Sequence, residues 1–418
     1  MNETDGFSYD LLKRLTFPRF GGTEHELRAA LLLQEEIAAL GRESELEPFD
    51  IPAYRIERAA ITVTAPFTRS IDCVARGFSG QLPEGGAELP LRYIEMDSPI
   101  AFRGLEDLSG TAVLVERLGE KMYRELVERR AAAIITIASN KWYQADADLL
   151  PTEMRPNYLK WGALPTFTVR PYDAAAMLRD GAATLRLELR QRSYTATSHN
   201  VVAVVEGTEP TDEWVAVTAH YDSTSITPGA WDNGSGTAAV MGLYRHFLNH
   251  PPRRNMRFIW CGSEEQGLLG SRAYVRAHQE LLPSCRMCFN FDMCGSILGN
   301  NEISFIGPEA LETMVRQVCD EAGFPSNVDA YVDSSDSAPF ACAGVPVVCP
   351  SRGHWTSQEM HTRHDTLDTI SPQKLHEMVA FSTALIGFFV NAPDFPIARE
   401  IPADAAATLE KRFGPAVP

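Results

Sequence analysis

In the second half of the chain, seven side chains follow apolar runs of the sequence. All seven are of types that can bind metals or transfer protons. They are His220, Asp222, Asp232, Glu264, Glu265, Asp292 and His361. Their mixture of imidazole and carboxylate suits zinc, and also cobalt or manganese. Each residue alone is weak evidence, because a histidine at the end of a strand is more often a hydrogen-bonded structural residue. The argument therefore depends on the whole set and its order.

Two metal ions about 3.5–4 Å apart need one bridging carboxylate and terminal ligands on each ion. Five ligands in the order His, Asp, Glu, Asp, His meet that need, and one glutamate of the adjacent pair Glu264 and Glu265 is then left over. A spare glutamate can act as general base on a water whose pKa the ions lower toward about 7. The residue types thus predict a two-metal hydrolytic site.

The surrounding elements must bring these residues together. After Ser198 the chain alternates apolar strands, such as WVAVTAH, RFIWCGS and MCFNFDM, with helical stretches, such as TAAVMGLYRHFL and SRAYVRAHQELL. This alternation predicts an α/β fold in which a mixed, mostly parallel sheet is sandwiched by helices. Ligands of such sheets bind at the carboxyl ends of the strands, so we expect the seven residues to converge on one rim.

Two helices outside this alternation have clear start signals. Thr23 and Glu26 form a T-x-x-E capping box ahead of an apolar stripe that ends at Gly41. Ser371 followed by Pro372 predicts the start of a last helix that runs to about Val390.

The segments AHYDS, DNGSG, SEEQGLLGS, FDMCG and HTRHDTLD, in this order, closely resemble the co-catalytic di-zinc aminopeptidases of metallopeptidase family 28. The resemblance extends from about Thr197 to Val390 and implies the phosphorylase/hydrolase-like fold of zinc exopeptidases. It implies that Asp232 bridges two zinc ions. His220 and Asp292 would then hold one ion, and Glu265 and His361 the other.

The same resemblance assigns the remaining roles. Glu264 would be the general base, and Asp222 would orient His220 as a ligand. Tyr331 lies about where some relatives place a tyrosine that stabilises the oxyanion, although an ordinary packed tyrosine is an equal alternative. Ser337 departs from the family, which commonly has histidine there, so its role is open. Asp365 is expected to cap a helix or to support its loop.

The implied activity is that of a metal-dependent exopeptidase, an aminopeptidase that releases N-terminal residues from short peptides. A dipeptidase or carboxypeptidase of the glutamate carboxypeptidase type shares these ligands and is the main alternative. It would need a cationic pocket, which Arg352 and Arg363 could supply. A single-zinc glutaminyl cyclase and a binding protein without metals are further alternatives. His354 and Trp355 are candidates for lining the substrate cleft.

The pattern of apolar and charged residues divides the chain into four parts. We expect residues 1–70 to be the N-terminal part of the peptidase domain, 71–192 an insertion, 193–395 the metallopeptidase catalytic domain and 396–418 a C-terminal tail. The insertion is β-rich and resembles the protease-associated domain that interrupts many members of the family. In those relatives the module overhangs the cleft, which implies limited access for folded proteins.

Composition bounds the partners. The 418 residues carry 38 Lys and Arg against 55 Asp and Glu, a formal charge of −17, which argues against nucleic acid or an anionic membrane as a partner. The N-terminal residues lack the pattern of a signal peptide, and the eight cysteines are few, so we expect a cytoplasmic protein with free thiols. The oligomeric state stays open, a homodimer included.

Overall fold

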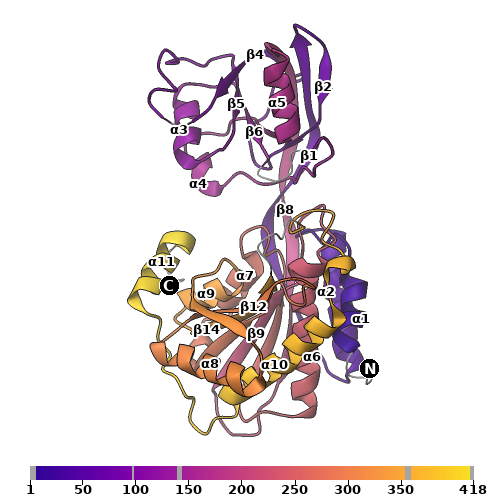
Figure 1. The fold of residues 1–418 in the computed structure, drawn as a ribbon, viewed down its shortest axis with the longest axis vertical. Coiled ribbons are helices and arrows are strands. Elements are labelled where there is room, and N and C mark those ends of the chain that lie inside the picture. Colours follow the sequence, from indigo (N-terminus) through magenta and orange to yellow (C-terminus); the bar gives the residue numbers. More distant parts are fainter. Residues whose placement is uncertain (1–5, 97, 139–143, 354–358, 415–418) are drawn as a thin grey trace. The chain divides into compact units, whose positions relative to one another are not determined.

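The computed structural model describes residues 6–96, 98–138, 144–353 and 359–414. The chain forms two compact units, of which unit 1 comprises Met1–Ile51 and Ala196–Pro418, and unit 2 comprises Pro52–Thr195 (Figure 1). Both boundaries fall inside long strands, β1 (Glu45–Ala65) and β8 (Thr184–Val205). Each of these strands therefore contributes residues to both units.

Seven strands at the centre of unit 1 are hydrogen-bonded in the order β13-β12-β14-β11-β9-β10-β8, and β1 also pairs with β8. Besides β8, the seven strands are β9 (Trp214–His220), β10 (Asn255–Cys261), β11 (Cys285–Asn290), β12 (Asn300–Ile306), β13 (Ser326–Ala330) and β14 (Val347–Gly353). Four neighbouring pairs are parallel, and the pairs of β10 with β8 and of β12 with β14 are antiparallel. The expected mixed, mostly parallel sheet is thus confirmed.

Helices cover both faces of this sheet (Figure 1). One face packs on α1 (Phe7–Leu15), α2 (Glu24–Ala39), α6 (Gly236–Asn249), α8 (Glu309–Ala322) and α10 (Pro372–Val390). The other face packs on α7 (Leu269–Ala277), α9 (Ser337–Cys342) and α11 (Ala403–Phe413). All seven residues of β9 are buried, as in a parallel strand that is covered on both sides.

The predicted helix starts are present. The Thr23 hydroxyl accepts a hydrogen bond from the Glu26 amide at the start of α2, and the Ser371 hydroxyl accepts one from the Lys374 amide at the start of α10. The expected tail contains α11, whose Leu409 is buried against the sheet. Short helical turns complete unit 1: η1 (Ala230–Ser235), η2 (Leu282–Ser284) and η3 (Leu367–Thr369).

Unit 2 has a hydrophobic core of its own. Its strands are β2 (Arg69–Ile71), β3 (Cys73–Ala75), β4 (Ala87–Ile94), β5 (Ala112–Val115), β6 (Ala133–Ile137) and β7 (Thr166–Val169), and its helices are α3 (Glu120–Glu128), α4 (Pro156–Leu159) and α5 (Pro171–Arg179). Its bounds, residues 52 and 195, are wider than the bounds of 71–192 expected from the sequence, because Ile61 and Val63 of β1 are buried in its core.

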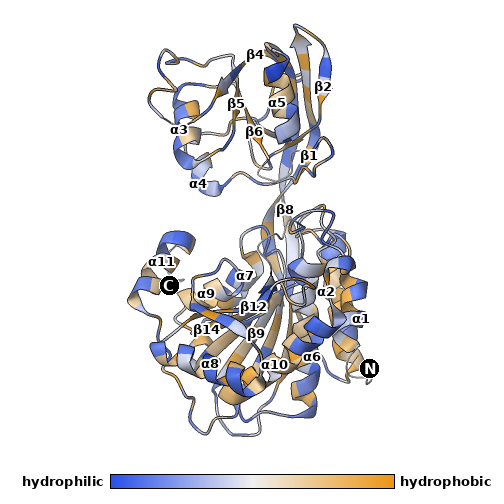
Figure 2. Cartoon of the chain, viewed as in Figure 1, coloured by the Kyte–Doolittle hydropathy of each residue, from blue (hydrophilic) through white to orange (hydrophobic). Residues whose placement is uncertain are grey.

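Apolar residues lie along the central strands of unit 1, and polar residues lie on the helices outside them, such as α8 (Figure 2). Among the described residues, no helix combines the length and the hydropathy that crossing a membrane requires. All eight cysteines are free thiols.

Candidate metal centre

The candidate ligands follow the carboxyl ends of four strands. His220 is the last residue of β9, Glu265 follows β10, Asp292 follows β11 and His361 follows β14. In the parallel register Cys261 of β10 lies beside His220, and β11 and β14 run in the same direction as β9. All four side chains therefore start from one edge of the sheet, as the sequence predicts.

The first group of ligand atoms surrounds His220. Its Nε2 lies 3.3 Å from Asp232 Oδ1 and 3.4 Å from Asp292 Oδ1. Glu264 Oε2 lies slightly farther, at 3.9 Å. His220 and Asp232 are buried, so the group lies inside the protein.

The second group surrounds His361. Its Nε2 lies 3.0 Å from Asp232 Oδ2 and 3.2 Å from Glu265 Oε2. This histidine is 37% exposed, whereas the side chains of Asp232 and Glu265 are each 8% exposed, so the second group meets solvent only on the side of His361. Asp232 belongs to both groups, with one carboxylate oxygen facing each, which is the arrangement that a bridging ligand requires.

The spacing fits zinc. Tetrahedral zinc with bonds of about 2.0–2.1 Å places its ligand atoms about 3.3 Å apart. The four ligand contacts of 3.0–3.4 Å match that edge length. Two buried oxygens, Asp292 Oδ1 and Glu265 Oε1, have no hydrogen-bond partner among the described residues, and a cation would satisfy both.

Asp222 lies beside His220, and its role in orienting that histidine stays a prediction. It is fully buried, and its Oδ1 lies 3.4 Å from His220 Nδ1. The same carboxylate accepts hydrogen bonds from the backbone amides of Glu264 at 3.0 Å and Glu265 at 3.2 Å. Asp222 therefore links the loops after β9 and β10, which the sequence motif alone did not indicate.

Comparison with known proteins identifies the family. Residues 200–386 match the sequence model of Peptidase family M28. The chain is 29% identical over 415 residues to Aminopeptidase YwaD of Bacillus subtilis, an alignment that covers 94% of this chain and 86% of that protein. The matched residues all lie in unit 1, which is therefore similar to peptidase family M28.

Two further similarities agree with this assignment. The solved structure of BSAP, described as a zinc aminopeptidase from Bacillus subtilis, superposes with a TM-score of 0.79 at 25% identity and covers 96% of this chain and 98% of that one. Leucine aminopeptidase 2 of Arthroderma otae is 29% identical over 184 residues, which are 41% of this chain and only 37% of that protein. The M28 assignment and the sandwiched α/β fold are thus confirmed, and zinc is the metal that this comparison supports.

Three residues at the candidate metal centre have backbone conformations of the left-handed region. Ser263, next to Glu264, has a φ of 54°, and Met293, next to Asp292, has a φ of 60°. His361 itself has a φ of 60°. Such conformations cost of order 1–3 kcal/mol each and cluster at functional sites, because only a well-determined surrounding structure retains them.

The loop that carries Asp232 is held by Asp365. The carboxylate of Asp365 accepts hydrogen bonds from the amides of Trp231 at 2.7 Å and Asp232 at 3.0 Å. Burial raises the pKa of Asp365 to about 7 despite these bonds. Asp365 thus supports its neighbouring loop, one of the two roles expected for it.

A buried hydrogen-bond chain that the sequence did not reveal reaches Asp292. The Thr218 hydroxyl donates to Asn290 Oδ1 at 2.7 Å, Asn290 Nδ2 donates to Ser335 Oγ at 2.8 Å, and Ser335 Oγ donates to Asp292 Oδ2 at 2.7 Å. A carboxylate only accepts, so the direction of the whole chain follows from its end. This series of hydrogen bonds ends at Oδ2 of Asp292, and the other carboxylate oxygen, Oδ1, faces His220.

The charges of the centre depend on one another. Burial raises the pKa of Glu264 well above its ordinary value, and it raises the pKa of Glu265 to about 7. Burial would lower the pKa of His361, but hydrogen bonds to Asp232 and Glu265 outweigh it and raise the value to about 11. Without a metal, the histidines are therefore held as cations among carboxylates, and an incoming ion must displace their protons.

Other candidates lie apart from these groups. Tyr331 follows β13 and its side chain is 58% exposed, so an oxyanion role for it stays a prediction. Ser337 is buried at the start of α9. Arg363 stands two residues after His361, in the segment before η3. His354 and Trp355 lie outside the described residues.

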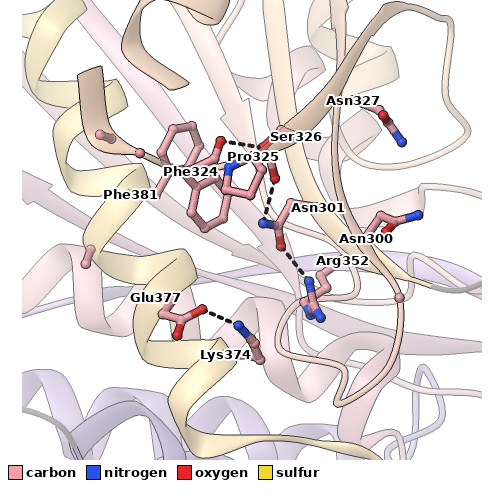
Figure 3. A pocket seen from close by; sticks show the side chains of 14 residues that line it. Asn300, Asn301, Phe324, Pro325, Ser326, Asn327, Arg352, Lys374, Glu377 and Phe381 are labelled. Atoms are coloured by element: carbon pink, nitrogen blue, oxygen red, sulfur yellow. Dashed lines mark hydrogen bonds and ion pairs between the residues drawn. The ribbon is translucent and has the colours of Figure 1, made fainter. Parts of the chain in front are cut away.

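Arg352, considered above as a receptor for a terminal carboxylate, is held in other bonds. It is 8% exposed, and its guanidinium donates to the Ser296 carbonyl at 2.7 Å and to Asn301 Oδ1 at 2.9 Å. It lines a cavity of about 880 Å³ between β12, β14 and α10 that contains none of the clustered ligands (Figure 3). Arg352 thus gives no support to the carboxypeptidase alternative.

Proposed function

We propose that unit 1 releases N-terminal residues from short peptides with two zinc ions and Glu264 as the general base. The observation that carries the proposal is that the two carboxylate oxygens of Asp232 face different histidines. Oδ1 faces His220, and Oδ2 faces His361. Similarity over 94% of the chain to a protein named as an aminopeptidase supports this activity over the dipeptidase or carboxypeptidase alternative.

In this proposal the five ligands divide into two sets. His220 and Asp292 would hold one ion, Glu265 and His361 would hold the other, and Asp232 would be shared by the two. The unpartnered oxygens of Asp292 and Glu265 support this division. Cobalt or manganese could replace zinc, because both accept the same ligand types.

When bound, the ions polarise the scissile carbonyl and lower the pKa of the attacking water. Glu264 then accepts the proton of that water and returns it to the leaving amine. Its carboxylate lies 3.9 Å from His220 Nε2, beside the centre, and Asp222 fixes its backbone amide. The buried surroundings give Glu264 a high proton affinity, which a base needs in order to take and return a proton.

Two further features are proposals of the same kind. We propose that unit 2 is a protease-associated module, since it is β-rich and has its own core. We also retain the cytoplasm as the location, which the eight free thiols support.

The test compares three versions of one short peptide: free at both ends, N-acetylated and C-amidated. Zinc-loaded protein is incubated with each, and products are weighed by mass spectrometry, with a chelator-treated sample as the blank. We expect stepwise loss from the N-terminus that acetylation abolishes and amidation spares. Loss from the C-terminus, or cleavage of dipeptides alone, would instead establish the carboxypeptidase or dipeptidase alternative.

A further inference from the structure

Arg19 lies in the segment between α1 and α2 and is completely buried. Its Nε donates to the Tyr221 carbonyl at 2.6 Å, Nη1 donates to the Pro228 carbonyl at 2.7 Å, and Nη2 donates to the Gly229 carbonyl at 3.0 Å. Nη1 also donates to the carbonyls of Leu15 and Phe17. One guanidinium therefore joins the N-terminal segment to a loop more than 200 residues away in sequence.

This loop connects two candidate ligands. Tyr221 directly follows His220, and Gly229 stands three residues before Asp232. The backbone of Arg19 adds two bonds near the start of the same loop, since its amide donates to Ser223 Oγ at 3.0 Å and its carbonyl accepts from the Ser223 amide at 3.3 Å. The loop is thus bound to Arg19 at both of its ends.

Gly229 packs so closely against Arg19 that a side chain would not fit there. Gly229 has a φ of 64°, and a Cβ there would lie 2.9 Å from Arg19 Nη2 and 2.7 Å from the Asp232 carbonyl oxygen. Glycine is therefore required both by its backbone conformation and by the close approach of the arginine.

Arg19 also brings a buried positive charge to the centre. Burial lowers its pKa to about 10, so the guanidinium stays protonated at neutral pH. Nearby Asp222, Asp365 and Asp232 oppose this lowering, which shows that their charges act on it. Every acceptor described for its side chain is a neutral backbone carbonyl, so no single carboxylate neutralises it.

We propose that Arg19 is a positioning residue of the metal centre, which holds the main chain after His220 and before Asp232 at the spacing that the two ions require. Arg19 thereby sets the affinity for zinc without touching metal or substrate. The inference rests on the proposed metal ligands.

Arg254 provides a matched control within the same unit. It is 5% exposed and also donates mainly to backbone carbonyls, those of Ala392 and Pro393, besides Glu213. Arg254 directly precedes β10, however, and so lies at the amino end of a strand whose carboxyl end leads to Glu264. Both arginines are buried and donate mainly to backbone carbonyls, but only Arg19 donates to the loop between His220 and Asp232.

The experiment compares Arg19→Lys with Arg254→Lys in the full chain. Lysine keeps the charge and loses the planar fork, so the comparison isolates the geometry. Metal-free proteins are titrated with zinc against a chromophoric chelator, and their thermal unfolding is recorded. We expect both variants to unfold at lower temperature, but only Arg19→Lys to bind zinc about 10- to 100-fold more weakly, the usual effect of removing support for ligands.

Wild-type zinc affinity in Arg19→Lys, or an equal loss in both variants, would overturn the inference. If Arg19→Lys does not fold, Gly229→Ala tests the same contact from the loop side and should also weaken zinc binding. If both fold, the double variant should lose less than the sum of the two, because both changes break one contact. A wild-type protein that binds no zinc would contradict the proposed function instead.

Discussion

The two units are both built on parallel strands, yet they bury different kinds of polar residue. In unit 2, strands β4 to β7 pair in parallel, and helices cover them. The buried polar residues described there are all uncharged: Ser79, Thr136, Thr166, Thr168 and Gln191. In unit 1 the buried polar set includes His220, Asp222, Asp232, Asp336 and Asp365. The parallel sheet alone therefore does not create a charged site.

The difference shows where the fold tolerates an energetic cost. An unpaired buried charge is strongly unfavourable, so a protein retains it only where an opposite charge or a bound ion compensates. In unit 1, two histidines and Arg19 lie among at least six carboxylates, and two divalent cations would compensate most of the excess negative charge. Unit 2 has no such excess among its described residues and is held by its apolar core.

The strongest test of this contrast removes the shared ligand. Asp232→Ala takes a ligand from both groups, so we expect loss of bound zinc and a fall of peptidase activity to the level of the chelator-treated protein. Elemental analysis and a peptide assay measure the two effects. The exposed carboxylate Asp107 of unit 2, replaced in the same way, should leave both unchanged. Retention of both ions by Asp232→Ala would show that the bridge is wrongly assigned.

Glu264→Gln should separate chemistry from metal binding. The amide has nearly the same shape but cannot accept the proton, so we expect kcat to fall by about 10²- to 10⁴-fold. Zinc content should stay at the wild-type level, because the proposed ligand set does not include Glu264. Wild-type turnover in this variant would rule out the assigned base.

Zinc affinity should rise with pH. The pKa of His361 is raised to about 11 and that of His220 lies well above its ordinary value, so at neutral pH both must release a proton to bind an ion. Linkage then predicts about a 10-fold gain in affinity per pH unit for each proton released. Chelator competition between pH 6 and 8 measures the slope, and a flat profile would show that the histidines are not ligands.

The smallest effect on the centre is expected from a change in the core of unit 2. Ile135, fully buried in β6, loses packing in Ile135→Ala, which should cost about 2–5 kcal/mol of unfolding free energy. Zinc affinity should stay within about 2-fold of wild type. Calorimetry and zinc titration measure the pair, and a large loss of zinc affinity would mean that the two units do not carry separate tasks.

Local sequence was sufficient for much of the catalytic unit. Strands and helices alternate where apolar periodicity predicts them, and Thr23 and Ser371 cap helices as their spacing indicates. The candidate ligands end up at one edge because parallel strands align their carboxyl ends. These are properties of short segments, so the residues themselves contain the information.

The remaining features depend on contacts between distant segments. Arg19 meets Tyr221 across 202 positions, and Ser335 meets Asp292 across 43. No periodicity or motif encodes such a meeting, because it forms only when the sheet brings separate loops together. The wider bounds of unit 2 and the docking of α11 through Leu409 have the same origin. The sequence by itself determined the types and order of the candidate ligands, whereas only the tertiary structure decided that each oxygen of Asp232 faces a different histidine, because that division depends on loops held from distant parts of the chain.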